Sequence, residues 1–165
     1  MILHAGFVAL RLRGFWRGVL IRGPSGAGKS DLALRALDAG FRLVADDRVI
    51  VWKSGGLLYG RAPSPIAGAI EVRGHGVTPE PSLGLAEAAL VADCVRSGAD
   101  VERMPESETT SLLGLRVALV RIDPLEASAP AKLRRALQHL GHKPQQAYQA
   151  RSSGGGDRLG TGDTL

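Results

Sequence analysis

The sequence has few cysteines, few aromatic residues and no long apolar run. Cys94 is the single cysteine among 165 residues, which excludes an internal disulfide framework and a metal site built on cysteines. With 3 Phe, 2 Trp and 2 Tyr residues, the chain offers few side chains that could stack on nucleic-acid bases. No stretch approaches the roughly 20 apolar residues that a membrane span needs. We therefore expect a cytoplasmic protein whose partners include neither nucleic acid nor a membrane.

Acidic residues are absent from residues 1–30, which contain five cations: Arg11, Arg13, Arg17, Arg22 and Lys29. These five account for the formal net charge of +5, because the remaining 16 basic residues balance 16 acidic ones. A basic chain often binds nucleic acid or an anionic surface along its whole length. Here the excess is confined to one segment, which points to a local anionic ligand.

Hydrophobic periodicity predicts an α/β fold. Apolar alternation or short apolar runs indicate strands, and a period near 3.6 with apolar residues on one face indicates helices. The predicted strands are residues 7–12, 18–21, 41–45, 69–73 and 115–122, together with a hairpin of residues 49–52 and 57–59. The predicted helices are residues 29–39 and 129–140. Residues 88–95 fit either a helix or a strand, and residues 77–81 and 103–112 are predicted as loops.

The order of these elements predicts how the chain is organised. Two strands, a helix and a third strand open the chain, which suggests a parallel strand pair joined by a crossover helix. We expect one domain over residues 1–145. The polar, glycine-rich residues 146–165 lack core-forming side chains and are predicted to be a disordered tail.

The most specific motif lies between the strand at 18–21 and the helix at 29–39. It matches the phosphate-binding (Walker A) pattern G-x-x-x-x-G-K-[ST] at every constrained position. In such a loop the backbone N–H groups and the helix N-terminus face phosphate oxygens, the lysine reaches the β- and γ-phosphates, and the serine hydroxyl binds Mg²⁺. The predicted nucleotide-binding residues are Gly23, Pro24, Ser25, Gly26, Ala27, Gly28, Lys29 and Ser30.

Two adjacent carboxylates, Asp46 and Asp47, follow the strand at 41–45. In phosphate-loop enzymes an acid at the end of a neighbouring strand positions Mg²⁺, and a carboxylate can also serve as base toward an attacking hydroxyl. The alternative is a pair of solvated turn residues. Spacing alone does not assign the two roles between the two aspartates.

These residues resemble the HPr kinase/phosphorylase family, in its short bacterial form that consists of the catalytic domain alone. The resemblance covers residues 3–140 and includes the upstream His4. It is carried by the glycine-rich motif, by Leu43-Val44-Ala45-Asp46-Asp47-Arg48-Val49 and by Glu71-Val72-Arg73-Gly74. It implies a phosphate-loop fold with a mixed sheet, similar to the HPr kinase catalytic domain.

The resemblance also implies a function: an ATP- and Mg²⁺-dependent kinase that phosphorylates a serine of the phosphocarrier protein HPr. It makes Lys29 and Asp47 catalytic, with Asp47 as the base, and adds His4 and Arg103 to the active site. Ser30, Glu71 and Asp46 are the implied metal ligands. For His4 the alternative is an ordinary surface or packing residue, and for Arg103 a solvated charge among acidic neighbours.

Partners and direction of reaction follow from the same resemblance. The family forms homo-oligomers, often hexamers, through this domain. Its long forms carry a basic Arg-Pro-Gly-type segment linked to the reverse, phosphorylase reaction, where this chain reads Leu113-Gly114-Leu115-Arg116. The kinase direction is therefore expected, and the reverse direction stays open. Two other functions remain open as well: a kinase of another acceptor, and a catalytically slow ATP-binding signalling module.

Overall fold

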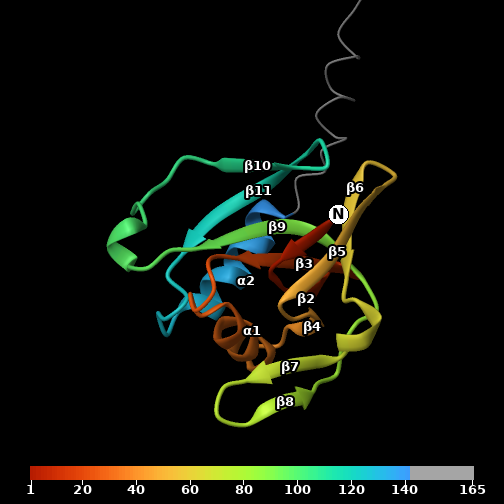
Figure 1. The fold of residues 1–165 in the computed structure, drawn as a ribbon. Helices are drawn as coiled ribbons and strands as arrows, with labels where there is room; N and C mark the ends of the chain where they lie inside the picture. The colour runs from red at the N-terminus through yellow and green to blue at the C-terminus, as the bar shows by residue number, and fades with distance from the viewer. Residues whose placement is uncertain (142–165) are drawn as a thin grey trace, which may run out of the picture.

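A curled mixed β-sheet and two α-helices make up the fold in this computed structural model, which describes residues 1–141 (Figure 1). The predicted tail, residues 146–165, lies outside the described residues. The helices are α1 (Lys29–Asp38) and α2 (Ala129–Leu140). The strands are β1 (Ile2–His4), β2 (Gly6–Leu12), β3 (Phe15–Arg22), β4 (Arg42–Ala45), β5 (Arg48–Ser54), β6 (Leu57–Arg61), β7 (Ala69–Val72), β8 (Gly76–Pro79), β9 (Ala86–Cys94), β10 (Glu108–Leu112) and β11 (Leu115–Ile122). The predicted mixed α/β class is confirmed.

Strand β9 is the centre of the sheet. It pairs in parallel with β3 along one edge and with β11 along the other, while β6 pairs antiparallel with its first residues. The sheet runs β1-β5-β6-β9-β3-β2-β4, and β10 joins it through β11. A strand covered on both faces reads as a continuous apolar run, which is why periodicity left residues 88–95 open between helix and strand.

The predicted direct pairing of the strands on either side of α1 is wrong. Strands β3 and β4 both pair antiparallel with β2, so they run in the same direction but have β2 between them. A tight turn joins β2 to β3, with φ of 49° at Arg13 and 87° at Gly14. Two successive positive φ values are typical of hairpin turns that match strand twist. The hairpin therefore places β2 beside β3, in the position that the prediction gave to β4.

Two predicted loops contain strands. Residues 76–79 form β8, which pairs with β7 in a separate two-stranded ribbon beside α1 (Figure 1). Pro79 is tolerated there because β8 is an edge strand. Residues 108–112 form β10, which pairs antiparallel with β11 at the outer edge of the sheet. Both strands lie at sheet edges that face solvent, where polar residues and proline are tolerated, so their sequences lack the apolar pattern that predicts a strand.

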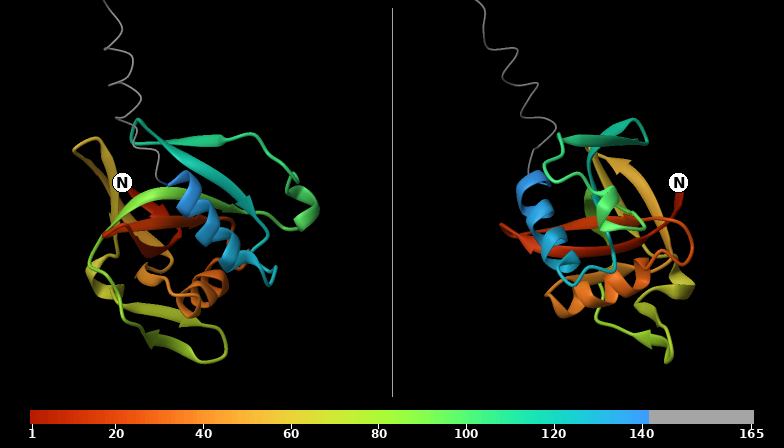
Figure 2. Two further views of the ribbon diagram at one scale, coloured as in Figure 1. Left: turned by 180° about the vertical axis from the view of Figure 1, so that it is seen from behind. Right: turned by 90° about the vertical axis from the view of Figure 1, so that its left-hand side faces the viewer.

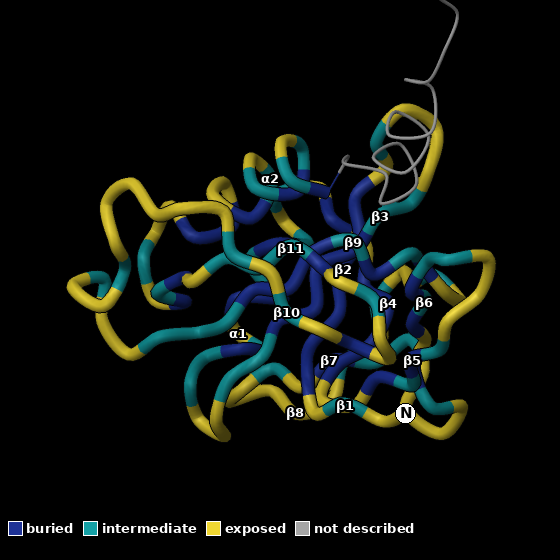
Figure 3. Tube along the Cα trace, turned by 90° about the horizontal axis from the view of Figure 1, so that it is seen from above, coloured by how far each residue is buried: buried dark blue, intermediate teal, exposed yellow. Residues whose placement is uncertain are grey.

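Each face of the central strands buries its own apolar cluster. The two helices cover one face, and Figure 2 shows α2 lying across it with α1 beside it. The helix side chains buried there are Leu32, Ala33 and Ala36 of α1 and Leu133 and Leu137 of α2. On the other face the sheet curls, so that β5 and β6 cover it with apolar side chains. Buried positions concentrate in the middle strands and exposed ones in the loops (Figure 3). Within residues 1–141, no helix combines the length and the apolar character needed to cross a membrane.

Candidate functional site

The glycine-rich loop, residues 23–30, connects β3 to the first turn of α1. Gly28, with φ of 100°, is the N-cap of α1, and no side chain among residues 1–141 caps the helix there. The first N–H groups of a helix have no acceptor within it. A Cβ built on Gly23 would lie 2.9 Å from Cys94 Cβ, so a side chain at this position would collide with β9. The loop therefore presents a free, positively polarised helix end at the carboxyl edge of the sheet.

Lys29 lies inside this loop and is only 8% exposed. Its Nζ donates hydrogen bonds to the carbonyl oxygens of Gly23 at 2.9 Å and Pro24 at 3.0 Å. These two carbonyls accept two of the three ammonium N–H donors and hold the group where the loop begins. The charge is thus fixed beside the helix N-terminus, where it adds to the attraction for an anion.

Asp46 joins the loop to two other elements. Its Oδ1 accepts a hydrogen bond from Ser30 Oγ at 2.9 Å, and its Oδ2 accepts one from the backbone N–H of Glu71 at 3.0 Å. The side chain is buried, so both bonds lie in a partly dehydrated setting where they are strong. Asp46 therefore fixes the end of β4 against α1 and brings β7, with Glu71, to the same place.

Asp47 contacts different groups from those of its neighbour Asp46. Its φ of 67° lies in the left-handed region, which non-glycine residues adopt rarely and which occurs often at functional sites. Its Oδ1 lies 3.2 Å from Nδ1 of His4, and its Oδ2 lies 3.9 Å from Nε of Arg48. The pairing of β1 with β5 opposes His4 to Arg48, which brings the histidine to the acid pair. The carboxylate stays about half exposed.

The donor set beside the loop fits a magnesium ion. Among the described residues no group of three or more His, Cys, Asp and Glu side chains gathers to form a metal site of its own. Mg²⁺ bound with a nucleotide usually takes only one or two protein oxygens and completes its shell with phosphates and water. Ser30 Oγ and Asp46 Oδ1 are 2.9 Å apart, close to the roughly 3.0 Å between neighbouring oxygens of an octahedral ion with bonds of about 2.1 Å. The residues present therefore suit the ion.

Arg103 is not brought to these groups. It lies on the segment between β9 and β10 and lines a cavity of about 920 Å³ with residues of β11 and α2. That cavity includes no residue of the glycine-rich loop and neither His4 nor Asp47. Within residues 1–141, no hydrogen bond or ion pair joins Arg103 to the site.

Two structural features at the site were missed in the sequence. Arg22, which directly precedes the loop, forms a two-pronged ion pair with Asp93 of β9, at 2.8 and 2.9 Å. Residues 123–126, which follow β11, lie against Gly28. Both depend on the parallel pairing of β3, β9 and β11, which brings the carboxyl ends of these strands to one edge and which no local sequence pattern indicates.

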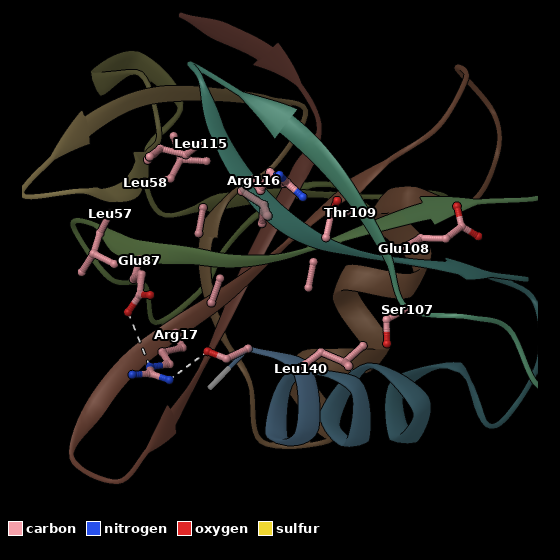
Figure 4. Close-up of a pocket in the computed structure, with 15 residues that line it drawn as sticks. Arg17, Leu57, Leu58, Glu87, Ser107, Glu108, Thr109, Leu115, Arg116 and Leu140 are labelled. Atoms are coloured by element: carbon pink, nitrogen blue, oxygen red, sulfur yellow. Dashed lines mark hydrogen bonds and ion pairs between the residues drawn. The ribbon is translucent and has the colours of Figure 1, made fainter. Parts of the chain in front are cut away.

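A second pocket lies at the opposite end of these strands, near the start of β9 (Figure 4). It has a volume of about 350 Å³ and is lined mainly by apolar side chains. Arg17 and Glu87 form an ion pair of 3.5 Å at its margin, and Arg17 also donates to the carbonyl of Gly141 at 2.8 Å. Burial raises the pKa of Glu87 above its ordinary value of 4.5, and Arg17 offsets this only in part. This pocket contains no residue of the glycine-rich loop.

Comparison with known proteins agrees with this geometry. Residues 4–81 match the family model described as HPr Serine kinase C-terminal domain. An HPr kinase/phosphorylase of Clostridium tetani is 48% identical over 66 residues, which are 40% of this chain and 22% of the relative. One from Clostridium kluyveri is 52% identical over 60 residues, 36% of this chain and 20% of the relative. The matches thus span about a fifth of the length of these relatives.

A solved structure resembles the whole described fold. The Hpr(Ser) kinase/phosphatase from Coxiella burnetii superposes with a TM-score of 0.70 at 23% identity, covering 93% of this chain and 99% of that one. The fold is therefore the mixed α/β fold of the HPr kinase catalytic domain. The resemblance to the HPr kinase/phosphorylase family is confirmed, and the segment that carries it, residues 4–81, contains the glycine-rich loop, the acid pair, His4 and Glu71.

Proposed function

We propose that this chain is an ATP- and Mg²⁺-dependent protein kinase that transfers a phosphoryl group to a serine of HPr. The observation that carries the proposal is the hydrogen bond from Ser30 to Asp46. It links the glycine-rich loop to the acid pair, so that a phosphate at the loop and the carboxylate of Asp47 share one site. The family match over the same residues supports this assignment.

In this proposal the glycine-rich loop binds the phosphates of ATP. The N–H groups at the start of α1 and the ammonium of Lys29 face phosphate oxygens, and they offset the charge that shifts during transfer. Ser30 and Asp46 hold Mg²⁺, and Glu71 contributes from β7. When bound, the ion neutralises phosphate charge and orients the terminal phosphoryl group.

Asp47 is the proposed catalytic base. A serine hydroxyl is a weak nucleophile, and a carboxylate that accepts its proton makes it a better one. The new O–P bond forms as the bond from the γ-phosphorus to the β–γ bridging oxygen breaks, and ADP leaves. The left-handed backbone of Asp47 turns its carboxylate away from the buried partners of Asp46 and leaves it accessible. His4 Nδ1, at 3.2 Å, orients Oδ1, and Oδ2, which lies 3.9 Å from Nε of Arg48, is the oxygen proposed to accept the proton.

The acceptor and the assembly rest on the relatives. The curated relatives are named HPr kinase/phosphorylase, and HPr is accordingly the proposed acceptor. By the same resemblance we propose a homo-oligomer, with a hexamer as the expected form. Arg103 is part of the proposal only if substrate binding draws the 98–106 segment toward Asp47.

Transfer from labelled ATP tests the proposal. The protein, Mg²⁺ and HPr are incubated with γ-labelled ATP, and the labelled HPr residue is identified by mass spectrometry. Label on a serine is expected with the wild type, and a loss of about 10²–10⁴-fold with Asp47→Asn at unchanged ATP binding. Asp38→Asn, at the exposed end of α1, is the matched control and should keep full activity. Bound ATP without any label on HPr would refute the proposed acceptor, and other proteins would then be screened in the same assay.

A further inference from the structure

The segment after β11 is in direct contact with the N-cap of α1. A Cβ built on Gly28 would lie 3.3 Å from Cγ of Pro124 and 3.4 Å from Cδ2 of Leu125. Residues 123–126 therefore form one wall of the glycine-rich loop, although they are almost 100 positions away in the sequence. Any side chain at position 28 would press against this wall, which is one reason why a glycine stands there.

This wall is held in place by α1 itself. Arg35, one and a half turns beyond Lys29 and Ser30, donates hydrogen bonds to the carbonyl oxygens of Pro124 and Glu126. The backbone N–H of Leu125 donates to Asp123 Oδ1 at 3.0 Å, which closes a local turn. The helix that carries Lys29 and Ser30 thus also fixes the position of Leu125 relative to them.

Leu125 is held firmly and yet exposed. Its side chain is 72% accessible, although the neighbouring Pro124 is buried. A single exposed leucine is ordinary on a protein surface. One hydrogen bond from Leu125 itself and two that Arg35 donates to the neighbouring carbonyls hold this leucine in a defined position beside the glycine-rich loop.

Sheet order gives the direction in which a bound nucleotide lies. Four strands run in the same direction: β11, β9, β3 and β4. Their carboxyl ends lie at one edge of the sheet, where ligands of such sheets bind. Asp46 and Asp47, after β4, lie on one side of the glycine-rich loop, and residues 123–126, after β11, lie on the other. A nucleotide whose terminal phosphate reaches Asp46 directs its nucleoside toward Leu125.

We propose that Leu125 is the contact for the nucleoside base, so that residues 123–126 form the base subsite of the nucleotide site. This rests on the proposed function, because it places the phosphates in the glycine-rich loop. A leucine side chain packs on the flat face of any purine and gains affinity by burying apolar surface. The subsite therefore raises affinity for purine nucleotides without selecting adenine over guanine.

Binding of ligands with and without a base tests the proposal. Dissociation constants for the Mg²⁺ complexes of ATP, GTP and inorganic tripolyphosphate are measured by calorimetry for the wild type and Leu125→Ser. We expect Leu125→Ser to weaken ATP and GTP about tenfold and tripolyphosphate less than about twofold. Leu125→Met should bind like the wild type. Phe15→Ser, an equally drastic change at another exposed apolar residue, the first of β3, should change nothing.

The outcomes separate this inference from the proposed function. If Leu125→Ser leaves ATP binding unchanged, or weakens tripolyphosphate as much as ATP, the base subsite is refuted and the phosphate site stands. If the wild type binds neither ATP nor tripolyphosphate, the proposed function fails and the subsite with it.

Discussion

Two ion pairs of the same chemical type bridge β3 and β9, one at each end of the strand pair. Arg22 and Asp93 lie next to the glycine-rich loop and form two hydrogen bonds of 2.8 and 2.9 Å. Arg17 and Glu87 lie at the start of the same strands, 3.5 Å apart. The register of β3 on β9 pairs Arg22 with Asp93 and Arg17 with Glu87 directly.

The two ion pairs have different roles because their arginines connect to different parts of the fold. Arg22 is covalently next to Gly23, so its ion pair fixes the point at which the glycine-rich loop leaves the sheet. Arg17 reaches the carbonyl of Gly141 after α2, and its partner Glu87 is buried enough that its pKa rises despite the cation. One pair therefore positions a candidate active site, and the other ties a helix to the sheet. Position in the fold, not residue type, separates the two roles.

Among the changes that compare the two ends of the strand pair, the largest effect is expected at the loop end. Lys29→Met removes the only charge held inside the glycine-rich loop, and we expect phosphoryl transfer to fall by about 10²–10³-fold. Lys53→Met, at an exposed position of β5, is the matched control. Initial rates with labelled ATP and HPr measure both. Equal rates for the two variants would show that the loop end is no more functional than the rest of the surface.

Cys94 is the last residue of β9 and lies beside Gly23. The reactivity of its thiol therefore measures how closely the start of the glycine-rich loop is packed. Burial raises the pKa of its thiol from 9.0 to about 11, although Lys29 opposes the shift. Because the thiolate is the reactive form, alkylation at pH 8 should be about 100-fold slower than for a free cysteine thiol. Iodoacetamide labelling followed by mass spectrometry measures the rate. Labelling as fast as in the denatured protein would contradict the packing at Gly23.

Replacing each arginine by methionine, in separate variants, compares the two ion pairs directly. Arg22→Met should lower kcat/KM about tenfold while changing the free energy of unfolding by less than about 1 kcal/mol, since the pair is partly exposed. Arg17→Met should leave activity within about twofold but destabilise the fold by about 1–3 kcal/mol, because Glu87 loses its cation and Gly141 a donor. Kinetics and urea unfolding of both variants are required. The reverse pattern would mean that the assignment of roles is wrong.

The smallest expected effect is the pH dependence at Glu87. A carboxyl whose folded-state pKa is raised binds protons more readily when folded, so its contribution to stability falls as pH rises above 4.5. Glu87→Gln removes this titration. The difference in unfolding free energy, wild type minus variant, should therefore decrease between pH 4 and 7. Urea unfolding across that range measures it, and an increasing difference would contradict the burial of Glu87.

Local patterns were sufficient to predict much of the fold and the residues that meet at the candidate site. The motif at residues 23–30, the helix behind it and the acids after β4 each depend on neighbouring residues, and each was found. The contact of His4 with Asp47 depends on β1 pairing with β5, and the wall at Leu125 depends on β11 pairing with β9. Strand partners are set by contacts distant in the sequence, which periodicity does not encode.

The same limit explains the strand errors. The turn at Arg13 and Gly14 places β2 between β3 and β4, and no pattern in β4 itself indicates its neighbour. Asp46 and Asp47 are equivalent as sequence. They differ in the structure because one is buried between Ser30 and Glu71, and the other has a left-handed backbone and contacts His4.

The central claim is that Asp47 takes the proton of a serine at a site shared with ATP. Single-turnover transfer from ATP to HPr, measured as a function of pH for the wild type and Asp47→Asn, tests it most directly. We expect label on an HPr serine with the wild type, and a rate lower by about 10²–10⁴-fold with Asp47→Asn at unchanged ATP affinity. Transfer by Asp47→Asn at the wild-type rate and with the wild-type pH profile would contradict the account.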